Sequence, residues 1–501
     1  MARYMRVMPI SLLGALVPSL LGAQASRVIV GGEVDARLEV EGSRDQEDAR
    51  AVGRVSLRPT FSLDGGPTMS FDVLLGTPAE ASGSLHPEEY SVGLDWRGAQ
   101  AGFGHVKQSY SRLAVQDVSV QGGRFFVERR GVRLSAFGGR SDPGGAPPSP
   151  FERHVEGGRV GVGDPESTAF DVILIRARDE LRPLAASADD STADGPGDGI
   201  TAQQSLVVGA MGSAAIFDRA LSFRGEIMRS ALTTDPGAMS QDGEVLDSPV
   251  GEGSRVDFAH GLEATARLAS LTATVRYRSI GAEYQSPGVR WLPTDRREVG
   301  LSATLRVADW EAVLNASRER DNLSGEEALT TAASRVEARL ALPSLKGWST
   351  KLQAEYRTRG DDAAGPDDRT HERTWILGTH QELRMSEQGV LRSASMGYGY
   401  EVRDDGNPLR GDGGSDAHAF NVELLTSPAD ELRVLPSFRL VSSGGGPEPR
   451  TVRRVYVMQA QHHPGGGRLR LALEVRRTAH PEAVWWEAAL TSRLTLGGLD
   501  R

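Results

Sequence analysis

The sequence predicts an all-β fold, a single transmembrane up-and-down antiparallel β-barrel of about 24 strands, within a range of about 20 to 24 and without a plug domain. Three observations lead to this prediction. Apolar and polar residues alternate along many segments, short and long polar links alternate between those segments, and helical periodicity is hard to find. An open sheet of this size would expose two unpaired edges, so we expect the sheet to close on itself.

Alternation is clearest in residues 348–359, which read WSTKLQAEYRTR. Trp348 and Leu352 fall on one parity, whereas Lys351 and Glu355 fall on the other. A period of two residues places the two sets on opposite faces of a β-strand. Runs of about 8 to 16 residues have the length of tilted strands that cross a bilayer. Similar runs occupy residues 90–103, 299–307, 335–342 and 468–476.

The links between these runs differ systematically in length. Short links occur at 64–66, 97–98, 129–131, 217–220, 308–310, 344–347 and 462–467. Long polar links occur at 139–153, 179–203, 233–253, 321–330, 360–370 and 404–415. An up-and-down barrel has tight turns at one rim and long loops at the other, whereas a Greek-key sandwich would disrupt this order. The rhythm of the links therefore favours the barrel.

Composition excludes several classes of function. The chain has 501 residues, a formal charge of −10, 39% hydrophobic residues and 59 glycines. This charge provides no global basic field, so we expect no nucleic-acid partner. The chain has no cysteine, which excludes thiolate metal sites, thiol nucleophiles and disulfides.

The N-terminal segment has the pattern of a secretory signal. Arg3 and Arg6 precede a short apolar run that reaches Ala23-Gln24-Ala25. This run is too short for a transmembrane helix, and the A-x-A pattern predicts cleavage, with an uncleaved anchor as the alternative. We therefore assign residues 1–25 to a signal peptide and residues 26–501 to the barrel. Strand-like alternation begins by about Val28, which leaves no room for an N-terminal plug.

Two sets of residues follow from the parity. Charged residues opposite the apolar parity are expected to line the lumen, where they form ion pairs that stiffen the wall or create a field that filters solutes. These residues are Arg335, Glu337, Arg339, Lys351, Glu355, Arg357, Arg468, Arg470, Glu474 and Arg476. Aromatic residues beside the short turns are expected to form a girdle at the membrane interface. They are Trp96, Phe217, Phe223, Trp310 and Trp348.

Chemical motifs are weak. Adjacent imidazoles on a strand point to opposite faces, so His462 and His463 are poor metal co-ligands. The acidic loop 188–201 could collect calcium through carboxylates but lacks EF-hand spacing, and such loops are usually solvated. No signature brings a nucleophile, a histidine and a carboxylate together. We therefore expect no enzyme activity, no cofactor and no metal site.

With its signal segment, its alternation and its turn rhythm, the chain resembles the outer-membrane β-barrel proteins of Gram-negative bacteria. Residues 110–141 are also similar to a segment of large uncharacterised barrels of Bacteroidota-like bacteria, which implies no activity. The resemblance implies an outer-membrane location, contact with outer-membrane lipid and lipopolysaccharide, and insertion by the barrel-assembly machinery. Such barrels typically end in an aromatic residue, whereas this chain ends in RLTLGGLDR, which puts its recognition by that machinery in doubt.

The expected function is a channel or translocation conduit with a charged, wet lumen. The alternative is a structural or assembly scaffold that hosts a partner subunit or displays surface loops. A round barrel of about 24 strands would have a backbone diameter on the order of 45–50 Å. So wide a hole requires a flattened wall, loops such as 107–121 and 181–203 folded inward, or a protein subunit that fills the lumen.

Overall fold

The computed structural model describes most of the chain after the predicted signal segment. It covers residues 28–43, 50–77, 86–141, 151–181, 203–234, 254–289, 292–363, 369–386, 388–406, 414–445, 448–463, 469–479 and 484–496. The predicted signal peptide and almost all of loop 181–203 lie outside these residues. No helix in the described part of the chain is long and apolar enough to cross a membrane.

The described residues form a sheet of 24 strands, each between 9 and 16 residues long. The first twelve are β1 (Val28–Ser43), β2 (Arg50–Leu63), β3 (Thr68–Gly76), β4 (His86–Trp96), β5 (Ala99–Gln108), β6 (Val118–Arg129), β7 (Val132–Ser141), β8 (Phe151–Gly163), β9 (Ala169–Leu181), β10 (Gln203–Ile216), β11 (Leu221–Thr234) and β12 (Arg255–Arg267). The other twelve are β13 (Leu271–Ile280), β14 (Arg296–Val307), β15 (Trp310–Arg320), β16 (Thr331–Ala341), β17 (Trp348–Asp361), β18 (His371–Arg384), β19 (Leu391–Asp405), β20 (Ser415–Ala429), β21 (Leu432–Gly445), β22 (Glu448–His462), β23 (Leu469–Ala479) and β24 (Val484–Leu496).

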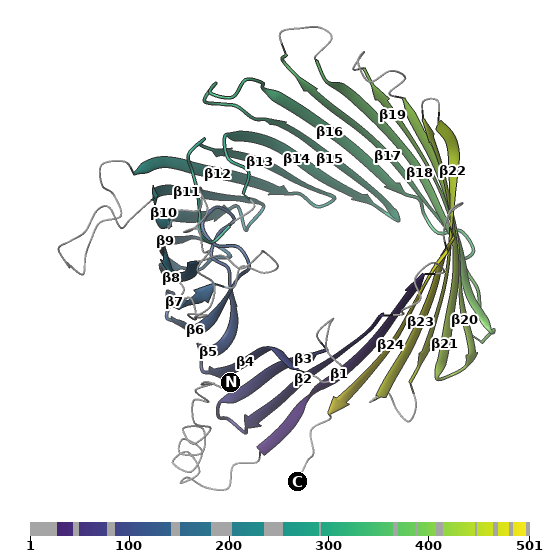
Figure 1. The fold of residues 1–501 in the computed structure, drawn as a ribbon, viewed down its shortest axis with the longest axis horizontal. Coiled ribbons are helices and arrows are strands. Elements are labelled where there is room, and N and C mark those ends of the chain that lie inside the picture. The colour runs from purple at the N-terminus through teal and green to yellow at the C-terminus, as the bar shows by residue number, and fades with distance from the viewer. Residues whose placement is uncertain are drawn as a thin grey trace, which may run out of the picture.

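Every strand pairs antiparallel with its neighbours in sequence, and β1 pairs with β24 to close the sheet. The closing register runs from Gly32 opposite Leu496 to Ser43 opposite Trp485. Figure 1 shows the resulting ring. The predicted closed up-and-down barrel of about 24 strands is confirmed, and the described part of the chain contains no domain besides it.

The two rims differ in the length of their links. Strands β4 and β5 are joined by Arg97 and Gly98 alone, both with positive φ, 50° and 82°. Two positive φ values are typical of the tight turn whose twist matches that of the flanking strands. Glycine adopts this conformation without strain, which explains the residue at position 98. The rim that carries such turns is called the short-turn rim, and the opposite rim is called the long-loop rim.

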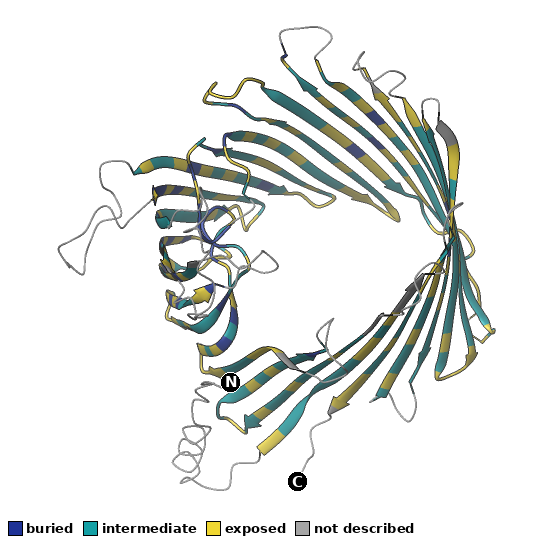
Figure 2. Cartoon of the chain, in the orientation of Figure 1, coloured by how far each residue is buried: buried dark blue, intermediate teal, exposed yellow. Residues whose placement is uncertain are grey.

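The two faces of the wall differ in composition. We call the face that carries Leu340, Leu352 and Leu377 the outer face; these leucines are register neighbours or share one parity. Large apolar residues on this face are exposed, as Leu352 is at 42%. Exposed and less exposed residues alternate along the strands in Figure 2. A sheet with an exposed apolar face and no open edge is suited to contact with lipid.

Candidate lumenal site

Two links from the long-loop rim pack against the opposite face of the wall, the inner face. They are residues 109–117, between β5 and β6, and residues 281–289, after β13; we call them the lumenal segments. Leu113 and Val115 are fully buried, in one cluster with strand residues that include Ile173 and Met228. Loops lie within the ring beside these strands in Figure 1. Residues 109–117 thus fold inward. This is one of the three ways of narrowing the lumen that the width of the barrel suggested.

Hydrogen bonds fix the two lumenal segments to each other across a wide separation in sequence. The hydroxyl of Tyr284 donates to the carbonyl of Leu113 at 2.8 Å, and the hydroxyl of Ser286 donates to the carbonyl of Ala114. The backbone N–H of Gln116 donates to the carbonyl of Gly288 at 3.1 Å. A side chain at position 288 would collide with the Ala114 carbonyl, because its Cβ would lie 2.3 Å away. Close backbone approach therefore requires glycine at this position.

Burial also determines the protonation of Tyr284. Loss of solvation raises the pKa of its phenol, and the negative charge of Glu226 acts in the same direction. The phenol therefore remains a hydrogen-bond donor to Leu113 at neutral pH. Within 109–117, the hydroxyl of Ser109 donates to the carboxylate of Asp117 at 2.8 Å and accepts its backbone N–H at the same distance. This reciprocal pair closes the base of the loop.

Charged residues surround a cavity next to the lumenal segments. The cavity has a volume of about 620 Å³ and is lined by both the segment 109–117 and the inner face of the wall. Arg133, only 2% exposed, donates to both carboxylate oxygens of Asp171 at 3.1 Å. Arg159 lies 3.7 Å from the same carboxylate and 5.5 Å from the ring centroid of Tyr110. The cation over the ring attaches the loop to the charged wall.

Cross-strand ion pairs on the inner face also line this cavity. Glu263 and Arg276 are direct register partners with N–O contact at 2.7 Å. Arg278 and Glu298 are direct partners on the next pair of strands, at 2.5 Å. Opposite charges placed directly across a strand pair stabilise the pairing.

Six of the residues predicted to line the lumen lie on adjacent strands β16 and β17. Glu337 and Glu355 are direct partners, 4% and 3% exposed. Two buried carboxylates opposite each other would repel, and arginines on both sides compensate. Arg335 lies 2.5 Å from Glu355, and Arg339 lies 2.5 Å from Glu337. The predicted residues Arg357 and Lys351 share this face of β17, and Arg357 forms an ion pair with Glu355.

Three more of the predicted residues, Arg470, Glu474 and Arg476, form a second group on β23. Arg476 contacts Glu474 at 3.2 Å and Glu487 of β24 at 3.3 Å, and Arg470 donates to Gln461 of β22 at 2.7 Å. Arg468 lies outside the described residues. The residues predicted to line the lumen therefore form two clusters, one on β16 and β17 and one on β23, with strands β18 to β22 between them.

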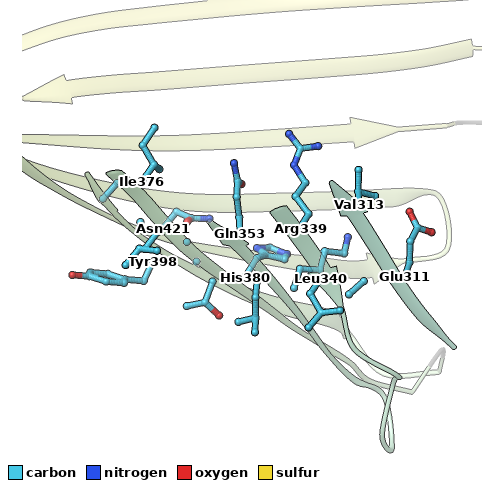
Figure 3. Close-up of a pocket in the computed structure, with 18 of the residues that line it drawn as sticks. Glu311, Val313, Arg339, Leu340, Gln353, Ile376, His380, Tyr398 and Asn421 are labelled. Atoms are coloured by element: carbon cyan, nitrogen blue, oxygen red, sulfur yellow. The ribbon is translucent and has the colours of Figure 1, made fainter. Parts of the chain in front are cut away.

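A second cavity lies at the wall of β15–β21, with a volume of about 790 Å³. Figure 3 shows Arg339 and Gln353 pointing to one side of the wall and Leu340 to the other. Gly378 and Gly399 are direct partners at this place, and both line the cavity. Two glycines opposite each other leave the inner face without side chains, which accounts for the hollow.

All five predicted girdle residues are exposed and lie in or beside turns of the short-turn rim. They are Trp96, Phe217, Phe223, Trp310 and Trp348. The sequence reasoning missed a second group of outer-face aromatic residues nearer the long-loop rim. Tyr356 and Trp375 stack there at 4.2 Å between ring centroids. Phe438 and Tyr456, 5.1 Å apart, lie on the same face midway along β21 and β22. The prediction used only aromatic residues beside short turns, so it did not include this second group.

His462 and His463 connect their own turn to the turn that contains Glu431. The backbone N–H of His463 donates to the carbonyl of Glu431 at 2.8 Å, and Nδ1 of His462 lies 3.2 Å from the same oxygen. Across the described residues, no group of three or more histidine, aspartate or glutamate side chains is arranged to hold a metal. The acidic loop 188–201 lies outside those residues.

The sequence matches no protein-family model and no curated protein. In fold, the chain is similar to a chain in the cryo-EM structure of the E. coli P pilus tip assembly intermediate PapC-PapD-PapK-PapG, with 12% identity and a TM-score of 0.52 over 96% of this chain and 63% of that chain. This chain thus spans about 63% of the length of that relative. It also matches the P pilus usher (PapC) translocation pore, at 9% identity and a TM-score of 0.43 over 93% of this chain and 99% of that chain. The siderophore receptor PirA from Pseudomonas aeruginosa matches at 9% identity and a TM-score of 0.46, over 94% of this chain and 81% of that chain.

The closed barrel, its exposed apolar outer face and the similarity in fold define the class of the protein. It is a large porin-like β-barrel of the bacterial outer membrane. At this identity the similarity shows the fold alone.

Proposed function

We propose that this protein is an outer-membrane channel or translocation conduit with a charged, water-filled lumen. The observation that carries the proposal is the inner face, where arginines and carboxylates occur on strand after strand from β12 to β17. Half-exposed guanidinium groups such as those of Arg335 and Arg357 require water on their open side. Rings of charged side chains of this kind select and orient solutes in pores.

The lumenal segments supply the constriction in this proposal. They cover the inner face near β7–β13, so they reduce the width of a lumen that would otherwise span tens of ångströms. Mixed charge around their cavity, with Arg276 and Arg278 paired to Glu263 and Glu298, supports passage of polar solutes without strong preference for one sign of charge.

A scaffold barrel is the second candidate. It is supported by similarity in fold to a chain from a structure that contains PapC together with PapD, PapK and PapG. In that case a partner subunit would occupy the part of the lumen that the lumenal segments leave uncovered. The charged inner face would then be a docking surface.

Planar-bilayer recording of the purified full chain separates the two. The channel proposal predicts large, steady conductance without added protein, and the double variant Y284F/S286A, which loses two hydrogen bonds between the lumenal segments, should show a higher or noisier conductance. The matched control S302A removes a hydroxyl bonded to Asn315 on the wall and should leave conductance unchanged. Silence of the wild type together with a co-purifying subunit would refute the channel and favour the scaffold.

Further parts of the proposal concern export and membrane contact. Residues 1–25 act as a cleaved signal, and the barrel-assembly machinery inserts residues 26–501. The residues on β16, β17 and β23 line the lumen, and the aromatic residues of the short-turn rim meet the membrane interface. With short turns in the periplasm, the long-loop rim faces the outside.

A further inference from the structure

Arginines on the outer face gather toward the long-loop rim. The register places the following on the same face as the lipid-exposed leucines: Arg176, Arg178, Arg229, Arg297, Arg318, Arg320, Arg373, Arg450, Arg454 and Arg477. Two of them lie over aromatic rings, Arg229 over Phe258 at 5.8 Å and Arg477 over Trp486 at 5.3 Å. Charged side chains on a lipid-facing wall are unfavourable near the midplane and tolerated only near an interface.

The densest group lies on β14 and β15. Arg297 and Arg320 are direct register partners, and Arg318 is two residues from Arg320 on the same face, opposite Val299. Like charges directly opposite each other destabilise a strand pair. The carboxylates of Glu298 and Glu319 point to the inner face, where they pair with Arg278 and Arg296.

No ion pair relieves this repulsion within the described chain. The carboxylate of Asp362 has its pKa lowered mainly by the backbone N–H of Thr330 and to a smaller extent by Arg320, with which it forms no ion pair. Three exposed guanidinium groups therefore share one patch of the outer face without a protein anion. An anion from the surroundings would stabilise them.

The height of the patch indicates where that anion comes from. Arg320, at one end of β15, is ten positions along the strand from Trp310, which lies beside the short turn. At about 3.3 Å per residue and a tilt of about 40°, they lie about 25 Å apart along the membrane normal, the height of the apolar band of such barrels. The arginines thus reach the head-group region of one leaflet, while Leu301 and Leu305 below them are exposed to acyl chains.

We propose that Arg297, Arg318 and Arg320 bind the phosphate groups of an outer-leaflet glycolipid, the phosphorylated lipid A portion of lipopolysaccharide. The planar fork of arginine donates two parallel hydrogen bonds to phosphate oxygens. The flanking residues Ser279 and Ser334, register partners of Arg297 and Arg318, add hydroxyl groups on the same face. The inference rests on the orientation given under the proposed function, with the long-loop rim outside.

Lipid binding to the purified full chain in detergent tests the site. The probes are bisphosphorylated lipid A, the same lipid without phosphates, and phosphatidylglycerol, each titrated and read by native mass spectrometry. Wild type should bind bisphosphorylated lipid A about tenfold or more tightly than either other lipid, and R297Q/R318Q/R320Q should lose about tenfold or more of that affinity. The variant R297K/R318K/R320K, which keeps the charge but not the fork, should retain only part of it.

A control variant removes the same charge from the opposite rim. Arg97, Arg129 and Arg130 lie in or beside short turns, so R97Q/R129Q/R130Q should bind as wild type does. Equal affinity of R297Q/R318Q/R320Q and wild type would overturn the site, and so would equal binding of the phosphorylated and dephosphorylated lipids. Equal binding of phosphatidylglycerol would overturn the glycolipid assignment.

Two further measurements distinguish failure of the glycolipid site from failure of the barrel to assemble and from failure of the channel proposal. If R297Q/R318Q/R320Q does not assemble, R320Q alone, at the end of β15, gives the same comparison with a smaller expected loss. Conductance is recorded on the same samples and should not change in either variant. Lipid binding without conductance would refute the channel but support the glycolipid site. Conductance without phosphate-dependent binding would support the channel but refute the glycolipid site.

Discussion

Replacement of Leu352 by arginine tests which face of the wall meets lipid. Leu352 lies four residues from Trp348, which stands at the short-turn rim, and its side chain is 42% exposed. Four residues at about 3.3 Å and a tilt of about 40° raise it about 10 Å above that rim. The position is close to the middle of an apolar band about 25 Å high, where an arginine costs about 2–4 kcal/mol.

The matched control is the next residue, Gln353, on the inner face. Its amide donates to the carboxylate of Glu337 at 3.2 Å, and its direct register partner is Arg339. An arginine at position 353 would therefore meet one acidic and one basic neighbour, whose opposing effects should change the free energy of unfolding little. Both variants are folded into phospholipid vesicles and unfolded by denaturant at equilibrium, with tryptophan fluorescence as the signal. Equal losses for L352R and Q353R would mean that the two faces have been assigned wrongly.

Four further outcomes are expected. E355Q should lower stability by about 1 kcal/mol or less in the same assay, because the two arginines that it leaves without a partner, Arg335 and Arg357, are half-exposed and because Glu337 no longer faces a second carboxylate; the loss should shrink at high salt. Because the pKa of Tyr284 is raised in the folded state, its contribution to stability should be intact below a pH of about 10 and decline as pH rises further; in the same unfolding assay Y284F should remove this alkaline loss of stability. Protease added to intact cells should cut within 181–203 and spare 462–467, and the reverse pattern would invert the topology. N-terminal sequencing should show that residues 1–25 are absent, and a mature chain that still begins with them would contradict the signal assignment.

Strand number and closure could be predicted because period two is a local signal. Each strand of the wall needs one apolar face, so a segment such as 348–359 carries its own evidence. The ends of individual strands could not be predicted as well as their number. The predicted long link 139–153 overlaps the ends of β7 and β8, which reach Ser141 and begin at Phe151. Polar residues at strand ends resemble loop residues, which explains the error.

Lumenal packing could be predicted only in part. Inward folding of 107–121 was one of three alternatives that the width of the barrel suggested, and no motif in that segment pointed to it. Its partner, 281–289, was missed because no periodicity marks it and because its contacts lie about 170 residues away, as between Tyr284 and Leu113. The buried pair Arg133 and Asp171 was missed for the same reason, since only the register brings β7 and β9 to either side of β8.

The inner face shows why the lumenal segments lie where they do. Beside them the wall presents Ile173, Ile175 and Met228, which are fully buried only because the segments cover them. From β12 to β17 the inner face carries cross-strand ion pairs instead, and under the proposed function water solvates their guanidinium groups. In the proposed channel, the lumenal segments cover one side of the barrel interior and water fills the other. That division supports a narrowed channel over an empty ring, and it leaves the charged side for a passing solute or a partner to contact.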